Sequence, residues 1–338
     1  VLITGGHMPG GLSDAGVCVD FWTDGGREVY LSGELMDTPH THGSGCTLSS
    51  ALAALLARGY SMTDALVLAR AYISAAIRAA RGIGLGPGPV AHRGWPQQLE
   101  DWPGVSSSWP RAVPRFPACR PLGLYPVVDD VSWIERLLSL GVTTIQLRIK
   151  QGGDGDSTEL RRQIARAVEL ARENSAQLFI NDHWQLAIEC GAFGVHLGQE
   201  DLDSADLASI ARAGLRLGVS THSDSEIARA HRLRPSYIAI GPIYETTTKK
   251  MAFTPRGLER LRRWVKLLRG SYPLTAIGGI DLARAPGVLA TGVGSCAVVR
   301  AITEAADPAQ AVRDLQQIHQ RGAAEEPVRG GGISSELA

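Results

Sequence analysis

Polar and charged side chains that could bind an anion recur in the second half of this chain, each directly after a short apolar run. The segment Gln146-Leu147-Arg148-Ile149-Lys150 is typical of a β-strand, which would place Gln146, Arg148 and Lys150 on one face. An unpaired cation is costly to bury, so two cations beside an amide require a polar, anionic partner. The alternative is an edge strand with a solvated face.

Later apolar runs end in the same way, which argues against the solvated-edge alternative. Their ends carry Asn181 and Asp182; His196, Gln199 and Asp201; Ser220, Thr221 and His222; the segment from Gly241 to Lys249; Gly278 and Gly279; and Arg300. Unrelated edge strands would not place their polar groups so regularly.

The elements that must position these residues alternate between predicted strands and helices. Strands are expected at 124–128, 142–150, 178–181, 194–197, 215–219, 237–241, 274–277 and 296–299, and clear helical patterns at 131–140, 157–174, 255–269 and 308–320. Eight parallel strands alternating with helices predict an α/β fold, a (β/α)8 TIM barrel over 121–321. In that fold the C-terminal ends of all strands meet at one mouth, which is where active sites lie.

Cations and carboxylates would converge at that mouth. Arg148, Lys150 and Lys249 suit an anionic substrate that carries more than one phosphate. Carboxylates among such cations commonly hold Mg²⁺, so we expect Asp182 and Asp201 to be metal ligands. Each could instead be a helix N-cap.

A second anion pocket is expected where this fold commonly binds phosphate. It would combine the hydroxyls of Thr246 and Thr248 with the backbone of Gly278-Gly279 and the end of the eighth strand. His196 is either a buried, hydrogen-bonded residue or a catalytic one.

The first 94 residues are expected to form a separate α/β part. A strand at 1–4 and a hairpin of 17–22 with 27–31 precede Gly43-Ser44-Gly45-Cys46, which leads into an Ala/Leu-rich helix. Glycines at a helix N-terminus expose backbone N–H groups toward an anion. His40, His42 and Cys46 are a weaker candidate for a metal site.

Residues 95–120 form a Pro/Trp-rich linker in this interpretation, and 322–338 a disordered tail. Trp95, Trp102 and Trp109 each precede a proline, and we expect them to dock on a neighbouring domain rather than to stack on a ligand.

Bulk composition excludes several classes of function. The 338 residues contain 34 Lys+Arg and 34 Asp+Glu, so no net charge points to nucleic acid or a membrane surface. Five scattered cysteines, with no signal peptide or membrane-span pattern, predict a cytoplasmic protein. The chain opens on Val1-Leu2-Ile3 without Met, so we expect it to begin inside a longer protein. The sequence leaves open whether it forms a homo-oligomer.

Six ordered motifs in the predicted barrel closely resemble thiamine phosphate synthases over about 122–320. They are Gln146-x-Arg148-x-Lys150, Asn181-Asp182, His196-Leu197-Gly198-Gln199-x-Asp201, Gly218-Val219-Ser220, Thr246-x-Thr248-Lys249 and Ile277-Gly278-Gly279-Ile280. The resemblance implies condensation of hydroxymethylpyrimidine diphosphate with thiazole phosphate, which yields thiamine phosphate and pyrophosphate. Glu245 and Arg300 depart from the usual Pro and Ser of the family.

The same resemblance implies roles for individual residues. Asp182 and Asp201 would bind Mg²⁺ on the pyrophosphate, and Gln146 would contact the aminopyrimidine. Ser220 would contact the pyrophosphate or the pyrimidine. The remaining pyrophosphate contacts would come from Arg148, Lys150, Asn181 and Lys249, and the thiazole phosphate would be seated by Thr246, Thr248, Gly279, Val299 and Arg300.

The N-terminal part resembles a different family, the ribokinase-like hydroxymethylpyrimidine (phosphate) kinases. The segment 37–49 is similar to their anion-hole motif, so Gly43, Ser44 and Gly45 would cradle a phosphoryl group from ATP and Cys46 would be catalytic. The family's lysine is replaced by Thr4, and the N-terminal half of such a kinase is absent. The chain would then be a bifunctional kinase/synthase whose kinase half is incomplete.

Three other functions are weighed against the synthase. A thiazole tautomerase of the same family would lack the residues that handle a diphosphate, and a non-catalytic thiamine-phosphate-binding module would not keep metal carboxylates. An unrelated isomerase or aldolase barrel would need a catalytic Glu or Schiff-base Lys, for which Lys249 is the only candidate.

Overall fold

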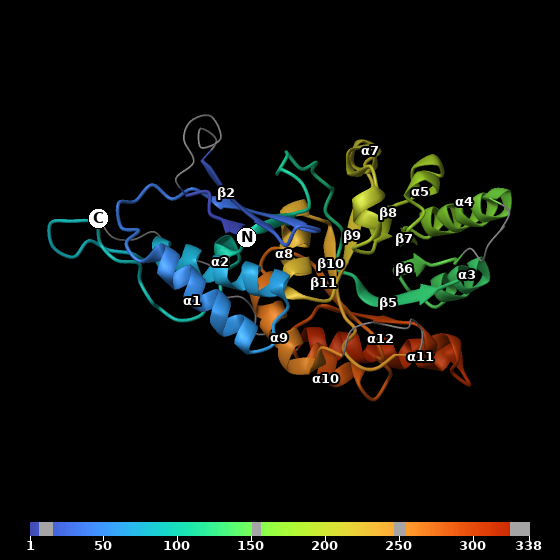
Figure 1. The fold of residues 1–338 in the computed structure, drawn as a ribbon. Coiled ribbons are helices and arrows are strands. Elements are labelled where there is room, and N and C mark those ends of the chain that lie inside the picture. Colours follow the sequence, from blue (N-terminus) through green and yellow to red (C-terminus); the bar gives the residue numbers. More distant parts are fainter. Residues whose placement is uncertain (7–15, 151–156, 247–254, 325–338) are drawn as a thin grey trace, which may run out of the picture.

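The computed structural model describes residues 1–6, 16–150, 157–246 and 255–324 (Figure 1). Its C-terminal part is a closed barrel of eight parallel strands in the order β10-β11-β12-β5-β6-β7-β8-β9. The strands are β5 (Gly123–Val128), β6 (Thr144–Leu147), β7 (Gln177–Asn181), β8 (Gly194–Leu197), β9 (Arg216–Thr221), β10 (Tyr237–Ile240), β11 (Leu274–Ile277) and β12 (Ser295–Val298). The predicted (β/α)8 barrel is confirmed.

Helices surround the barrel because each has one apolar face to bury against the strands. They are α3 (Val131–Ser139), α4 (Ser157–Glu173), α5 (Trp184–Glu189), α6 (Asp201–Ser204), α7 (Leu207–Arg212), α8 (Asp224–Leu233), α9 (Gly257–Leu268), α10 (Ala285–Leu289), α11 (Arg300–Thr303) and α12 (Pro308–Ala324). In α9, for example, Leu261, Trp264, Val265 and Leu268 are buried while charged residues cover the other face. No helix within the described ranges is long and apolar enough to span a membrane.

Three aromatic rings fill the interior of the barrel. Tyr125, Phe179 and Tyr237 are all buried and lie with ring centroids 4.9 to 6.0 Å apart. Two glycines make room for them, because a Cβ atom at Gly194 would approach the Phe179 ring to 2.7 Å and one at Gly218 would overlap the ring of Tyr237. Large rings on some strands are therefore matched by glycines on their neighbours.

The N-terminal part is a small α/β unit beside the barrel. Its antiparallel sheet has the order β1 (Leu2–Ile3), β2 (Val17–Thr23), β3 (Glu28–Glu34) and β4 (Gly104–Ser106), and it is accompanied by α1 (Ser44–Ala57) and α2 (Met62–Arg78). The buried Arg70 of α2 pairs with the buried Asp20 of β2 at 2.5 Å. The predicted hairpin and anion-site helix are both present.

The two parts are packed together through α8 of the barrel. In Figure 1, α2 and the sheet lie beside α8, and β4 approaches it so closely that a Cβ at Gly104 would lie 3.0 Å from Arg232. Asp64 of α2 accepts hydrogen bonds of 2.8 Å from the backbone N–H and the hydroxyl of Ser225 in the first turn of α8. A carboxylate at this position also interacts favourably with the helix dipole.

Three boundaries differ from the sequence predictions. The predicted strand at Gln146–Lys150 ends at Leu147, so Arg148 and Lys150 do not share a strand face with Gln146. The reason is local: after the Arg148 N–H donates to the Val128 carbonyl at 2.7 Å, the neighbouring strand β5 has ended and offers no further ladder partner.

The other two differences concern the ends of the barrel domain. The expected linker contains the 3-10 helix η1 (Leu99–Asp101) and β4, which belongs to the N-terminal sheet. Trp102 is buried in this part, whereas Trp95 and Trp109 remain 41% and 39% exposed, beside Tyr72 and Tyr30. The predicted tail begins at Gly322, but α12 continues to Ala324, and 325–338 lies outside the described residues.

Candidate active site

The barrel brings the predicted polar residues together at the C-terminal ends of its strands. Gln146 lies at the end of β6, Asn181 ends β7, His196 lies in β8, and Ser220 lies near the end of β9. The connections that follow the strands carry Arg148, Lys150, Asp182, Gln199, Thr246, Gly278, Gly279 and Val299, and the helices α6 and α11 begin with Asp201 and Arg300. Thr248 and Lys249 lie outside the described residues.

Two carboxylates face each other on this rim. Burial and the neighbouring charge of Asp201 raise the pKa of Asp182, while Arg148 opposes the rise. The N-cap of α5 is His183 and the N-cap of α6 is Glu200. Neither Asp182 nor Asp201 is therefore an N-cap, so the alternative role considered from the sequence is wrong. Two like charges held together without a cap function are suited to hold a cation between them.

The backbone around the carboxylates is specialised. Asp182 has a φ of 62°, in the left-handed region that few residues other than glycine adopt, and its N–H donates to the His196 carbonyl at 3.0 Å. The Gly198 N–H donates to the carboxylate of Asp201 at 3.1 Å, and a Cβ at Gly198 would lie only 2.9 Å from that carboxylate. Strained or sterically restricted positions such as these are concentrated at functional sites.

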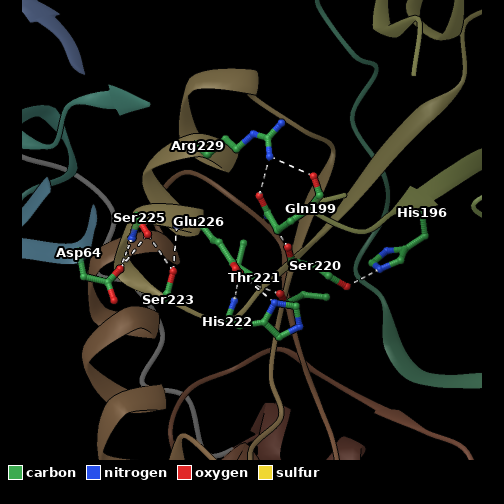
Figure 2. Close-up of polar contacts among 11 residues, drawn as sticks. Asp64, His196, Gln199, Ser220, Thr221, His222, Ser223, Ser225, Glu226 and Arg229 are labelled. Carbon is green, nitrogen blue, oxygen red and sulfur yellow. Dashed lines mark hydrogen bonds and ion pairs between the residues drawn. The ribbon is translucent and has the colours of Figure 1, made fainter. Parts of the chain in front are cut away.

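His196 is buried at the centre of a hydrogen-bonded chain. Its Nδ1 atom lies 2.7 Å from the hydroxyl of Tyr237. Its Nε2 atom lies 2.8 Å from the hydroxyl of Ser220 (Figure 2). Burial, assisted by the charge of Arg148, lowers the pKa of His196 to about 3. His196 is therefore neutral at physiological pH and carries no additional proton with which to act as a general acid.

The end of β9 is held from two sides. Figure 2 shows Gln199 donating to the Ser220 carbonyl at 2.7 Å, while Arg229 donates to the Gln199 carbonyl at 3.0 Å. His222 contacts Glu226 at 2.8 Å through its ring and at 2.6 Å through its backbone N–H. These contacts fix the backbone from which the Ser220 side chain projects.

The expected second anion pocket contains an unusually close backbone approach. Gly278 and Gly279 have φ values of 106° and 63°, and a Cβ at Gly278 would lie 2.6 Å from Pro242. The Tyr244 N–H donates to the Gly278 carbonyl at 3.0 Å, which holds the β10 connection against this turn. Nearby Arg300 is exposed at the start of α11.

The anion-hole segment of the N-terminal part lies away from the barrel mouth. Gly43 has a φ of 82° at the N-cap of α1 and makes no side-chain cap; the Ser44 N–H donates to the Thr41 carbonyl at 3.1 Å, which leaves the N–H groups of Gly45 and Cys46 in the first turn to face an anion. Cys46 is exposed in that turn. His40 does not point to a metal, because its Nδ1 atom accepts a hydrogen bond of 2.9 Å from the Gly88 N–H.

Three residues of the site were not predicted from the sequence. Tyr125 and Tyr237 lie within strands whose bodies were expected to be wholly apolar, yet their hydroxyls are 2.7 Å apart and Gln146 donates to Tyr125 at 3.1 Å. Arg229 was also missed, because it lies in a helix and reaches the rim only in the folded chain. A tyrosine within an otherwise aliphatic barrel strand was the signal available for the first two.

The fold and the site together define a class. A parallel barrel whose C-terminal rim gathers paired carboxylates, an arginine and a close glycine turn is an enzyme of the phosphate-handling (β/α)8 type. Comparison with known proteins gives the family. Residues 124–302, more than half of the chain, match the model of thiamine monophosphate synthase, and the chain belongs to that family.

Individual relatives agree with this assignment. The chain is 56% identical over 204 residues to the thiamine-phosphate synthase of Pectobacterium atrosepticum, which covers 60% of this chain and 94% of the relative. It is 60% identical over 186 residues to that of Klebsiella pneumoniae, with 55% and 86% covered. Among solved structures, thiamine phosphate pyrophosphorylase from Pyrococcus furiosus is 31% identical with a TM-score of 0.54, covering 60% of this chain and 97% of that chain. Residues 1–91 match the model of phosphomethylpyrimidine kinase, so both predicted resemblances are confirmed.

Proposed function

We propose that the barrel condenses hydroxymethylpyrimidine diphosphate with thiazole phosphate to give thiamine phosphate and pyrophosphate. The observation that carries this proposal is the Asp182–Asp201 pair beside Arg148, on the rim of a barrel of this family. Two facing carboxylates next to a cation suit a diphosphate bound together with a divalent metal ion.

The residues divide between the two substrates. Arg148, Lys150 and Asn181 hold the pyrophosphate oxygens, and Lys249, outside the described residues, completes this set in the proposal. The thiazole phosphate is held across the mouth by the close turn at Gly279, by the start of α11 at Val299 and Arg300, and by the Thr246 and Thr248 hydroxyls. This arrangement would place the leaving group and the nucleophile on opposite sides of the mouth.

The donor set fits Mg²⁺. Asp182 and Asp201 provide hard oxygen ligands, and burial together with the charge of Asp201 raises the pKa of Asp182 despite the opposing charge of Arg148, which supports a further cation at this pair. When bound, the ion would neutralise charge on the diphosphate. Arg148 supports the same charge from the protein side.

Catalysis in this proposal depends on placed charges rather than on a strong base. As the bond to pyrophosphate breaks, negative charge grows on the leaving oxygens and positive charge on the pyrimidine methylene, which the thiazole nitrogen then attacks. Fixed cations at the rim stabilise the first of these charges without reorganisation. His196 stays neutral because of its burial, so it adds no positive charge beside the pyrimidine.

The test is pyrophosphate release from the two substrates, with Mg²⁺ and then with a chelator. Release that needs both substrates and the metal is expected. Release from the diphosphate alone would mean hydrolysis, and no release while thiazole phosphate still binds would favour a tautomerase or a binding module.

A matched pair of variants tests the carboxylates. Asp182→Asn should lower turnover by at least about 100-fold because a metal ligand is lost, while thiazole phosphate binding measured by calorimetry stays unchanged. Asp314→Asn is the control, since Asp314 lies on α12, where its carboxylate accepts a hydrogen bond of 2.8 Å from Gln310. Equal activity of the two variants would refute the metal assignment.

For the N-terminal part we propose only phosphoryl binding at Gly43, Ser44, Gly45 and Cys46, with ATP as the expected ligand. The backbone N–H groups of Gly45 and Cys46 in the first turn of α1 support it. We place the protein in the cytoplasm, which is supported by its five unpaired cysteines.

A further inference from the structure

Five polar side chains form a continuous hydrogen-bonded chain through the interior of the barrel. It runs from Gln146 on β6 through Tyr125 on β5 and Tyr237 on β10 to His196 on β8 and Ser220 on β9, with successive distances of 3.1, 2.7, 2.7 and 2.8 Å. The first four of these residues are at most 6% exposed. Of the two ends, Gln146 is expected to contact the aminopyrimidine, and Ser220 the leaving pyrophosphate or the pyrimidine.

The direction of this chain is fixed at Tyr125. The Tyr125 hydroxyl already accepts from the Nε2 amide group of Gln146, which can only donate. If Tyr237 also donated to Tyr125, the proton of Tyr125 would have no acceptor, since Gln146 and Tyr237 are the only hydrogen-bond partners of this hydroxyl among the described residues. A buried O–H without a partner is costly, so Tyr125 must donate to Tyr237.

The same logic passes along the chain. Tyr237 accepts from Tyr125 and therefore donates its own proton to Nδ1 of His196. His196 is then neutral with its proton on Nε2, and it donates to the Ser220 hydroxyl. Ser220 is thus left with its own O–H free to donate toward the mouth of the barrel.

We propose that Tyr125, Tyr237 and His196 are positioning residues that fix the hydrogen-bonding polarity of Gln146 and Ser220. This inference rests on the proposed function and assigns to that site the means by which it recognises its pyrimidine. Ser220 is held as a donor to the pyrimidine or the leaving pyrophosphate. Gln146, whose Nε2 is committed to Tyr125, retains its carbonyl acceptor and one N–H donor.

Those two remaining groups of Gln146 match one particular chemistry. A carbonyl acceptor beside an N–H donor is complementary to an amino group next to a ring nitrogen, which is the edge that an aminopyrimidine presents. An oxo group in place of the amino group would face the carbonyl of Gln146 with a second acceptor. The fixed amide therefore discriminates between aminopyrimidine and oxopyrimidine diphosphates.

The aromatic interior makes this orientation rigid. Tyr125 and Tyr237 pack against Phe179, and the His196 ring stacks on Tyr237 with centroids 5.6 Å apart. The absence of a side chain at Gly218 lets the Tyr237 ring enter the barrel. The positions of the two hydroxyl oxygens are therefore fixed, so their protons can reach only the partners already named.

The first test is the protonation pattern of His196 in the substrate-free full chain, measured by nitrogen NMR of labelled imidazoles. Wild type should show a pyridine-like Nδ1 and a pyrrole-like Nε2. Tyr237→Phe removes the donor and should shift Nδ1 toward the pyrrole-like form as both tautomers become populated. A proton on Nδ1 in wild type, or an unchanged pattern in Tyr237→Phe, would overturn the proposal whatever the activity.

The matched control is Tyr272→Phe. The Tyr272 hydroxyl lies 2.8 Å from Nδ1 of the half-buried His231 and donates to the His231 carbonyl at 3.2 Å, a tyrosine–histidine contact outside the strands of the barrel. This variant should leave the His196 signals and the turnover unchanged. If it altered them as much as Tyr237→Phe does, the effect would be general destabilisation rather than positioning.

The second test is kinetic and uses Tyr125→Phe and Tyr237→Phe. Each should lose about tenfold in kcat/KM for the aminopyrimidine diphosphate, the equivalent of one hydrogen bond, with the KM for thiazole phosphate unchanged. In Tyr125→Phe the amide group of Gln146 is free to rotate by about 180°, because its hydrogen-bond partner is lost. The ratio of kcat/KM for the amino substrate to that for its oxo analogue should therefore also fall about tenfold. Unchanged preference in a folded variant would refute the role of Tyr125, whereas absence of turnover in wild type would refute the proposed function and leave the NMR result standing.

Discussion

Replacement of Gly218 by alanine should disrupt the interior of the barrel although only one methyl group is added. A Cβ atom built at Gly218 falls far inside the 3.0 Å limit that real Cβ contacts respect, and the atoms it meets are Cζ, Cε1 and the hydroxyl of Tyr237. Tyr237 is 0% exposed and packs against Tyr125, Phe179 and His196, so its ring cannot swing into open space. Either the ring or strand β9 must move.

The cost follows from two contributions. Overpacking of a well-packed core costs about 1–3 kcal/mol, and displacement of the Tyr237 hydroxyl weakens two hydrogen bonds worth about 1 kcal/mol each. The free energy of unfolding should therefore fall by about 3–5 kcal/mol, which corresponds to a decrease of roughly 6–20 °C in Tm for a domain of this size.

Urea and thermal unfolding followed by circular dichroism would measure this change. Gly294→Ala is the control, because a Cβ atom added at Gly294 would have no atom within 4 Å and the residue lies outside the left-handed φ range. A smaller alanine cost at 218 in a Tyr237→Leu background would identify the ring as the obstacle. If Gly218→Ala had the same Tm and the same urea midpoint as Gly294→Ala, the packing explanation would be wrong.

Three further predictions concern other parts of the same structure. Since burial lowers the pKa of His196 to about 3 from 6.5, only the unfolded chain binds this proton between these values, so stability should decline by up to about 1.4 kcal/mol per pH unit on acidification. Urea midpoints at several pH values should show a shallower decline for His196→Gln. Asp64→Ala should lose about 1–2 kcal/mol of unfolding free energy because Ser225 loses two hydrogen bonds at the start of α8, and Asp64→Asn should recover part of it. Cys46→Ala should leave pyrophosphate release intact, since Cys46 lies in the N-terminal part, and a loss of release would indicate that the two parts are catalytically coupled.

Most of the barrel could be predicted because its strands are short apolar runs with polar residues at one end. Strands β8 (Gly194–Leu197) and β11 (Leu274–Ile277) begin and end at the predicted residues. The prediction was wrong where the end of a strand depends on the neighbouring strand. The alternation through Lys150 suggested a longer strand, but β5 ends at Val128 and its hydrogen bonds to β6 stop there. The alternation of apolar and polar residues along one strand does not reveal the length of the strand beside it.

The candidate site divides in a similar way. Asp182 and Asp201 could be proposed as a pair because parallel strands place their C-terminal ends on one rim. Their function as N-caps could be rejected only when the helices were seen to begin after His183 and Glu200. The contact of Asp64 with Ser225 joins residues 161 positions apart, and no local pattern indicates it.

The sequence by itself determined the barrel, the residues at its mouth and the family, because strand periodicity and polar strand ends are local properties of the chain. Only the tertiary structure decided how Gln146, Tyr125, Tyr237, His196 and Ser220 connect, since each comes from a different strand. Which hydroxyl donates and which nitrogen carries a proton depends on partners that the closed barrel brings within 3.1 Å. Hydrogen-bond polarity is a property of the assembled interior, because every buried donor there must find its acceptor.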